Sequence, residues 1–159
     1  MTKRIVPLEV PWMISPSVSA FGLSASEGGD CEIVAAVAVI RAPESAADEP
    51  SAVRVRVRAG GWIRMSPMLD DTDPTRSWSG YSRADVFDWS GEDIDEYLAE
   101  FKRRWEASGV CPDPRAYEVV GSQWIRDVGA ERFGVKHFVL VGHDAWIEVL
   151  GKELSWEWV

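Results

Sequence analysis

The pair His143-Asp144 is the clearest candidate for chemistry in this chain, because a carboxylate beside an imidazole can orient a general base. It follows Gly142 between two predicted strands, and turn formation is the simpler explanation, since both residue types are frequent in turns. Cys111 is a second candidate, as a thiol nucleophile working with either His137 or His143. A small enzyme using His143 and Asp144 or Cys111 therefore stays open as a hypothesis, and no catalytic residue is assigned.

The familiar catalytic and cofactor motifs are absent from the sequence. It contains no G-x-G-x-x-G, no P-loop, no H-E-x-x-H and no G-x-S-x-G. Cys31 and Cys111 lie 80 positions apart without a C-x-x-C, which argues against a zinc site or a disulfide framework. We therefore predict neither a metal nor a cofactor.

Arg54, Arg56 and Arg58 alternate with valines, which places three guanidinium groups on one face of a predicted strand. Three like charges in a row repel one another unless acidic side chains on neighbouring strands pair with them. One interpretation is internal pairing with acids elsewhere in the chain, such as Glu148 or Glu157. The other is a binding site for a carboxylate or phosphate ligand, since the guanidinium fork suits both groups.

The negative charge is concentrated in residues 70–100, which hold ten acids and two bases, a balance of −8. The other 128 residues carry only −1, because the whole chain sums to −9. Aromatic residues are interleaved with these acids, a combination that attracts and anchors a basic protein partner. Alternatively, the acids solvate a loop and a helix start while the aromatics fold inward. The predicted partner-binding residues are Asp70, Asp71, Asp73, Trp78, Tyr81, Asp85, Asp88 and Trp89.

Tryptophan is abundant, with nine residues among 159. Trp105, Trp156 and Trp158 fall at predicted inward positions of a helix or strand, where core filling is expected. Trp12 and Trp124 lie near the ends of elements, where a flat aromatic surface can face a ligand. A small-molecule-binding sheet or barrel, with an aromatic-lined pocket and the arginine row for an anionic ligand, is therefore a second functional hypothesis.

The elements that must position these residues read mainly as strands. Alternating valines predict a strand over 53–58, followed by a bend at Gly60-Gly61 and a resumed strand over 62–65. An apolar run predicts a buried strand over 31–40, and prolines make 4–14 an interrupted edge strand. Loops are predicted over 15–30, 42–50 and 66–90.

One amphipathic helix is predicted over about 91–107. Ser90 and Asp93 form a start that resembles a capping box, and Gly109 supplies a stop. Acids precede bases along the segment, as the helix dipole favours. Apolar residues recur at three- and four-residue spacing and form a stripe of Ile94, Tyr97, Leu98, Phe101 and Trp105.

The rest of the chain reads as strands over 116–120, 135–141, 145–150 and 153–158, with a short helical turn after Ser122. The whole pattern predicts an α+β fold: a mainly antiparallel sheet, as a sandwich or a strongly curved sheet, packed on the one principal helix. With 159 residues, 46% of them hydrophobic, a single domain spanning 1–159 is expected.

The charge balance limits the possible partners. With a net charge of −9, general binding to nucleic acid or to an anionic membrane is not expected, because both need a cationic face. Pro7 and Pro11 interrupt the apolar stretch that a signal peptide needs, and Ile33–Ile40 is too short to span a membrane. We therefore expect a cytoplasmic protein, and the absence of asparagine with 13 arginines to 4 lysines is typical of a GC-rich bacterial genome.

The main functional hypothesis is a small acidic, intracellular bacterial protein-binding module. It would neutralise a basic partner through its acidic, aromatic-containing surface, as immunity proteins and antitoxins do. The acidic segment and the lack of catalytic motifs support this hypothesis. The ligand-binding sheet and the small enzyme are its alternatives, and the sequence gives no prediction of the oligomeric state.

Overall fold

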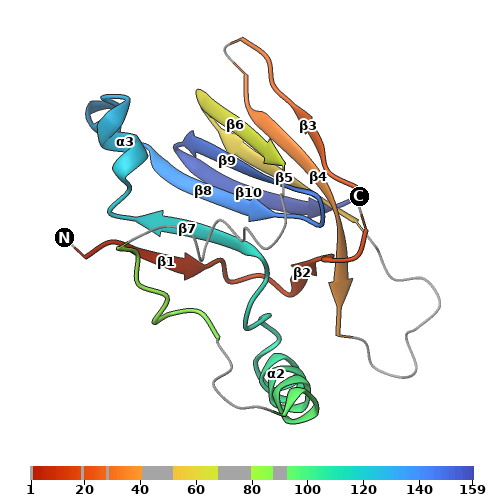
Figure 1. Cartoon of the computed structure of the whole chain (residues 1–159). Helices are drawn as coiled ribbons and strands as arrows, with labels where there is room; N and C mark the ends of the chain where they lie inside the picture. Colours follow the sequence, from red (N-terminus) through yellow and green to blue (C-terminus); the bar gives the residue numbers. More distant parts are fainter. Residues whose placement is uncertain (1, 19, 28, 41–51, 68–79, 88–92) are drawn as a thin grey trace.

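A computed structural model describes residues 2–18, 20–27, 29–40, 52–67, 80–87 and 93–159. These residues form ten strands, one long helix and two short helical segments (Figure 1). The strands are β1 (Arg4–Pro7), β2 (Trp12–Ile14), β3 (Gly22–Ser24), β4 (Cys31–Val39), β5 (Ala52–Arg58), β6 (Trp62–Pro67), β7 (Ala116–Val120), β8 (Lys136–Val141), β9 (Ala145–Gly151) and β10 (Glu153–Trp158). The helices are α2 (Ile94–Ser108), α3 (Gln123–Asp127) and the 3-10 helix η2 (Glu131–Phe133).

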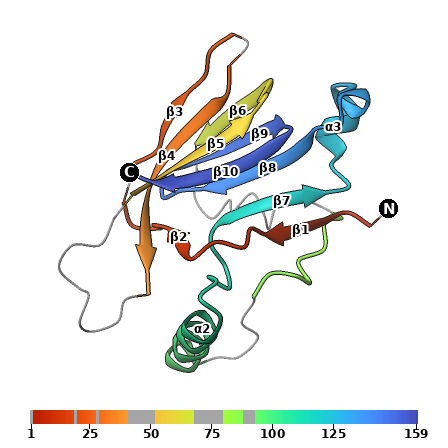
Figure 2. The same cartoon turned by 180° about the vertical axis from the view of Figure 1, so that it is seen from behind.

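The strands are arranged in two antiparallel sheets. The first sheet has the order β1-β7-β8-β9-β6, and the second has the order β10-β5-β4-β2, with β3 also paired to β4. The second sheet curls over the first, and α2 lies at one end of both (Figures 1 and 2). The predicted α+β fold with a mainly antiparallel, strongly curved sheet is confirmed.

A single bent ribbon joins the two sheets. β5 and β6 follow one another in the chain, opposite β10 and β9. Arg58 pairs with Glu153 on one side of the bend, and Trp62 pairs with Leu150 on the other. Three residues of one strand therefore face two of the other, which is a bulge, and a bulge bends its strand.

The bend requires glycine at two positions because the chains approach closely there. A Cβ atom on Gly60 would lie 2.9 Å from Cys31 Cβ, and one on Gly151 would lie 3.0 Å from the carbonyl oxygen of Arg58. Only a residue without a side chain fits at such distances. The predicted bend at Gly60-Gly61 is confirmed.

The main hydrophobic core lies between the two sheets. Val53, Val55 and Val57 are completely buried, and the arginines between them lie on the opposite face, as their alternation predicts. Burial of each such side chain contributes about 1.5–3 kcal/mol. The valines pack with inward residues of both sheets, among them Trp12, Ile33, Ala35, Phe138, Leu140, Ile147 and Val149.

A smaller cluster covers the opposite face of the first sheet. The register places Tyr117 of β7 opposite Val139 of β8 on that face. Val86 and Tyr81 pack against them from the segment 80–87. The described part of the acidic, aromatic segment therefore contributes side chains to a core.

Two of the predicted elements have different boundaries. The expected edge strand over 4–14 is two strands: β1 ends at Pro7, and β2 begins directly after Pro11. Proline lacks the N–H that a sheet ladder needs, which explains the break. The predicted loop over 15–30 contains the short strand β3.

α2 begins slightly later than predicted, at Ile94. Its N-cap is Asp93, whose carboxylate accepts hydrogen bonds from the N–H groups of Asp95 and Glu96 at 3.0 and 3.3 Å. The predicted cap residue Ser90 lies outside the described residues. The C-cap is as predicted, because Gly109 ends the helix in the left-handed conformation.

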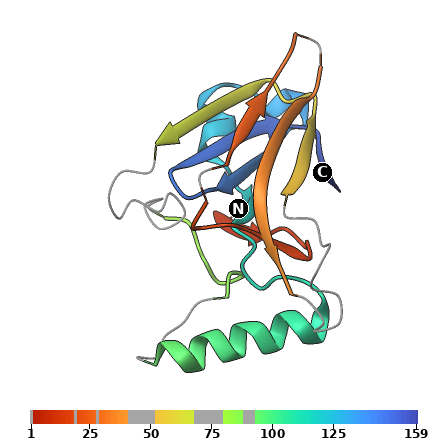
Figure 3. The same cartoon turned by 90° about the vertical axis from the view of Figure 1, so that its right-hand side faces the viewer.

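α2 is attached to the sheets near its end. Trp105 is 5% exposed, and its indole N–H donates to the carbonyl oxygen of Pro11 at 3.1 Å. In the first half of the helix, Ile94 and Leu98 are 57% and 54% exposed. The apolar stripe is thus only partly buried, because α2 lies at one end of the sheets and not across a sheet face (Figure 3).

Candidate functional site

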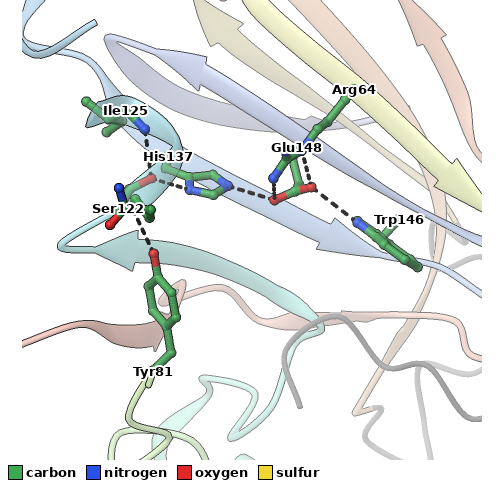
Figure 4. Close-up of polar contacts among 8 residues, drawn as sticks. Arg64, Tyr81, Ser122, Ile125, His137, Trp146 and Glu148 are labelled. Atoms are coloured by element: carbon green, nitrogen blue, oxygen red, sulfur yellow. Dashed lines mark hydrogen bonds and ion pairs between the residues drawn. The ribbon is translucent and has the colours of Figure 1, made fainter. Parts of the chain in front are cut away.

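A chain of five polar side chains lies on the face of the first sheet that is turned away from the main core (Figure 4). Ser122 Oγ lies 2.8 Å from His137 Nδ1, and His137 Nε2 lies 3.0 Å from Glu148 Oε1. Glu148 also accepts hydrogen bonds from Arg64, at 2.6 and 3.0 Å, and from Trp146 Nε1, at 3.3 Å. Ser122, His137 and Glu148 are 4%, 3% and 2% exposed.

The register of the first sheet brings these residues together. Glu148 of β9 lies between Val139 of β8 and Arg64 of β6. His137 lies two positions from Val139 and therefore on the same face. Ser122 follows β7 and is the N-cap of α3, which packs beside β8.

The carboxylate of Glu148 is ionised in spite of its burial. Burial raises the pKa of a carboxyl group, but the hydrogen bonds and positive charges of His137 and Arg64 outweigh it and lower the pKa of Glu148 to about 2. Because the ionised carboxylate can only accept, His137 Nε2 donates to Glu148, while Nδ1 contacts the Ser122 hydroxyl.

Serine, histidine and glutamate in this order are the groups of a nucleophile, a base and an orienting acid. The observed conformation withholds the nucleophile, because the Ser122 hydroxyl is buried and its oxygen accepts the Ile125 N–H at 3.2 Å. The Trp124 ring packs edge-on against His137 at 5.2 Å, and the Arg64 guanidinium stacks on Trp124 at 4.0 Å. The network therefore fastens α3 to the sheet, and an acyl substrate has no access to the hydroxyl.

This network was not predicted from the sequence. The suggested pairing of Glu148 with the arginine row is wrong, because Glu148 pairs with Arg64 in the first sheet. One sequence signal does indicate the network. Glu148 lies among apolar residues on a strand, and a charged residue at such a position needs a buried partner. Its partners could not be identified, because His137 and Ser122 meet it only through the register.

The arginine row lies on the outer face of the second sheet and is paired with acids of the neighbouring strands. The pKa of Arg56 is raised by its hydrogen bond to Glu32 and by the charge of that carboxylate. This geometry agrees with internal pairing, and the ligand site remains a prediction. The nitrogen–oxygen distances are 3.0 Å for Arg54–Glu157, 2.8 Å for Arg56–Glu32 and 3.4 Å for Arg58–Glu153.

Two of the predicted partner-binding residues are described, and both make contacts within the chain. The Tyr81 hydroxyl accepts the Gln123 N–H at 2.8 Å, and its ring packs in the smaller core cluster. Asp85 forms an ion pair with Arg4 at 3.1 Å and is 38% exposed at its side chain. The other six, Asp70, Asp71, Asp73, Trp78, Asp88 and Trp89, lie outside the described residues.

The remaining candidates for chemistry are not part of the network. His143 Nδ1 lies 2.5 Å from the carbonyl oxygen of Pro16, and its Nε2 lies 3.5 Å from Asp144. Both border a hollow of about 160 Å³, smaller than common ligand pockets. Burial raises the pKa of the Cys111 thiol to about 12, so it stays protonated at neutral pH.

A groove runs between α2 and the strand ends beside it, with a volume of about 360 Å³. Leu98 lines the groove. Ile94 lies one turn before Leu98 in the chain and on the same side of the helix. On the neighbouring flank, Phe87 stacks on Tyr97 at 5.4 Å. The other lining residues are Met13, Pro16, Ile40, Tyr97, Phe101, Lys102, Trp105, Asp113 and Arg115.

Acids accompany the exposed apolar residues of α2. Asp95 and Glu96 are exposed and make no ion pair with any residue that the structure describes. Further along the helix, Glu100 is neutralised by Arg103 and Arg104, at 2.6 and 2.8 Å. Two exposed acids without an ion pair to the described residues therefore lie in the first half of α2, next to Ile94 and Leu98.

Comparison with known proteins gives no match: no protein-family model, no curated protein and no solved structure resembles the chain. Within the ranges covered by the structure, no helix is long and apolar enough to cross a membrane. The same residues contain no group of three or more histidine, cysteine, aspartate or glutamate side chains that could hold a metal ion.

Proposed function

We propose that this chain is a protein-binding module that docks a basic partner on the first half of α2. The observation that carries the proposal is the exposure of two large apolar side chains, Ile94 and Leu98, one turn apart and beside an apolar groove. Contiguous exposed apolar surface of this kind is typical of interaction sites. Partner side chains that fill such a groove supply most of the binding energy of an interface.

The charge around these residues favours a basic partner. Asp95 and Glu96 place two exposed negative charges at this end of the helix, and the chain as a whole carries −9. Negative potential attracts a basic surface and accelerates its encounter with the helix. The cap Asp93 adds a third acid, although its carboxylate also binds the first turn.

The role that fits this surface best is neutralisation, as immunity proteins and antitoxins perform it. A small acidic protein that covers the basic surface of a partner needs no catalytic group. It needs an apolar anchor with acids around it. We place this activity in the cytoplasm of a bacterial cell, in line with the sequence-based expectation.

The experiment is affinity capture of the tagged chain from its native host, at low and moderate salt. We expect a basic protein in stoichiometric amount, lost as salt rises because its attraction is partly electrostatic. Leu98→Glu should lower the captured amount by about tenfold or more, because it places a charge where the apolar anchor docks.

The control variant is Met65→Glu, which also changes an apolar residue that is 49% exposed, but on β6 and away from α2. It should capture the partner as the wild type does. Equal capture by Leu98→Glu and wild type, or no captured protein at either salt concentration, would contradict the proposal.

A further inference from the structure

We infer that the same face of α2 binds a second copy of this chain, helix against helix and antiparallel, when no other partner occupies it. The inference builds on the proposed function, since it uses the same docking face. The partner is the chain itself, so the residues on both sides of the contact are those of α2 and its groove.

The exposed face of α2 is organised as a stripe with one charged flank. Ile94 and Leu98 form the stripe, four residues apart on the same side of the helix. Asp95 and Lys102 lie seven residues apart, two turns along one flank of that stripe. Phe87 packs on the other flank, against Tyr97 and Phe101, so a partner helix would meet the flank with the charges.

The two flank charges are available for contacts between molecules. Asp95 makes no ion pair with the described residues. Lys102 is 67% exposed at its side chain, and the structure gives it one ion pair, to Glu106 at 3.7 Å on the same helix. Such an exposed pair along a helix is weak and exchanges readily.

Antiparallel pairing makes this face complementary to itself. When two copies cross near Leu98, Asp95 of each copy faces Lys102 of the other, because their sequence positions are nearly symmetric about residue 98. Two-fold symmetry forms that ion pair twice. Parallel two-fold pairing would instead place the charged flanks of the two copies on opposite sides of the interface, so Asp95 of one copy would not meet Lys102 of the other.

The groove beside α2 gives the second copy an apolar contact. Leu98 of one copy meets the groove of the other, which is lined by Leu98, Phe101 and Met13 among other residues. A second copy therefore offers an apolar anchor with a cation beside it, the chemistry proposed for the basic partner. Self-association and partner binding are then mutually exclusive, and the partner displaces the second copy.

The test is sedimentation velocity of the full chain over about a hundredfold range of concentration. We expect reversible dimers, with dissociation constants in the micromolar range because one helix face gives a small interface. Asp95→Lys and Lys102→Glu should each weaken the dimer by about tenfold, because each places like charges opposite one another.

The double variant Asp95→Lys/Lys102→Glu is the decisive measurement. It reverses both charges, so the pairing between copies is restored and the dimer should return to within about threefold of wild-type affinity. Met65→Glu is the matched control for a new surface charge and should dimerise as wild type does. Circular dichroism of every variant verifies that the fold is retained.

The inference is overturned if the wild type stays monomeric throughout, or if the double variant dimerises no better than the single variants. These outcomes are separate from those of the proposed function. A monomeric chain that captures a basic partner through Leu98 refutes self-association alone. A dimer that obeys the charge reversal, in a chain that captures nothing from its host, refutes the basic partner alone.

Discussion

Glu148 is an acid inside a sheet, and its surroundings determine how the protein responds to pH. The carboxylate is 2% exposed and accepts hydrogen bonds from Arg64, His137 and Trp146. These partners stabilise its ionised form over its protonated form. Ionised Glu148 therefore stabilises the folded chain, and protonation removes that contribution.

We predict that acid unfolds this protein partly through Glu148. The carboxyl group has an ordinary pKa of 4.5 and a pKa of about 2 in the folded chain. A lowered folded pKa gives stability that is present above pH 4.5 and is lost as pH falls toward 2, and the shift corresponds to about 3 kcal/mol. Denaturant unfolding at pH values across this window measures the loss.

Glu148→Gln separates this effect from that of other carboxylates, such as Glu100, whose pKa is also lowered to about 2 by Arg103 and Arg104. At pH 7 the variant should be less stable than wild type by about 1–3 kcal/mol, because Arg64 and His137 lose their anion. Toward pH 2 the two proteins should converge. Parallel pH curves for the two proteins would show that Glu148 is not the responsible group.

The bent ribbon is the element that makes two sheets out of consecutive strands. β5 runs directly into β6 and β9 into β10, and both connections turn at glycines. The two sheets then enclose the buried valines of β5 between them. The curvature of the sheet thus depends on one bulge and two positions without a side chain.

We predict that Gly151→Ala destabilises the fold by about 1–3 kcal/mol, since the added Cβ would crowd Val57 and the Arg58 carbonyl oxygen. Gly61→Ala is the matched control at the same bend, because no heavy atom lies within 4 Å of its added Cβ. The control should lie within about 1 kcal/mol of wild type, or be slightly more stable. Chemical denaturation of both variants tests the prediction, and equal stabilities would contradict it.

At the scale of the whole molecule, the two sheets and α2 differ in how many buried side chains hold them in place. The core between the sheets contains most of the fully buried side chains, whereas α2 contributes one buried residue, Trp105. Elements with few buried contacts open at a lower free energy than the core does. We therefore expect α2 to come away from the sheets before they unfold.

Trp105→Ala should show this hierarchy. Removal of the indole ring deletes both the packing of α2 and its hydrogen bond to Pro11. Hydrogen exchange should accelerate across residues 94–108, while residues 136–151 keep the protection of wild type. Trp158→Ala removes a tryptophan that is 40% exposed and should leave exchange in α2 unchanged. Loss of protection in both segments would show instead that α2 is part of one cooperative unit.

The sequence by itself determined the local structure. Alternating valines specified β5 and its inward face, Gly109 specified the end of α2, and Ser122 specified the start of α3. These signals depend on side chains a few residues apart, whose geometry is set by the period of a strand or a helix. The antiparallel α+β fold follows from the number and spacing of such signals.

Only the tertiary structure decided which groups meet. Arg64 lies 84 positions from Glu148, and Arg54 lies 103 positions from Glu157. A shift of one residue in strand register would move each side chain to the other face, so no local pattern identifies these partners. The exposure of Leu98 was decided in the same way, because an apolar stripe specifies a face but not what covers it.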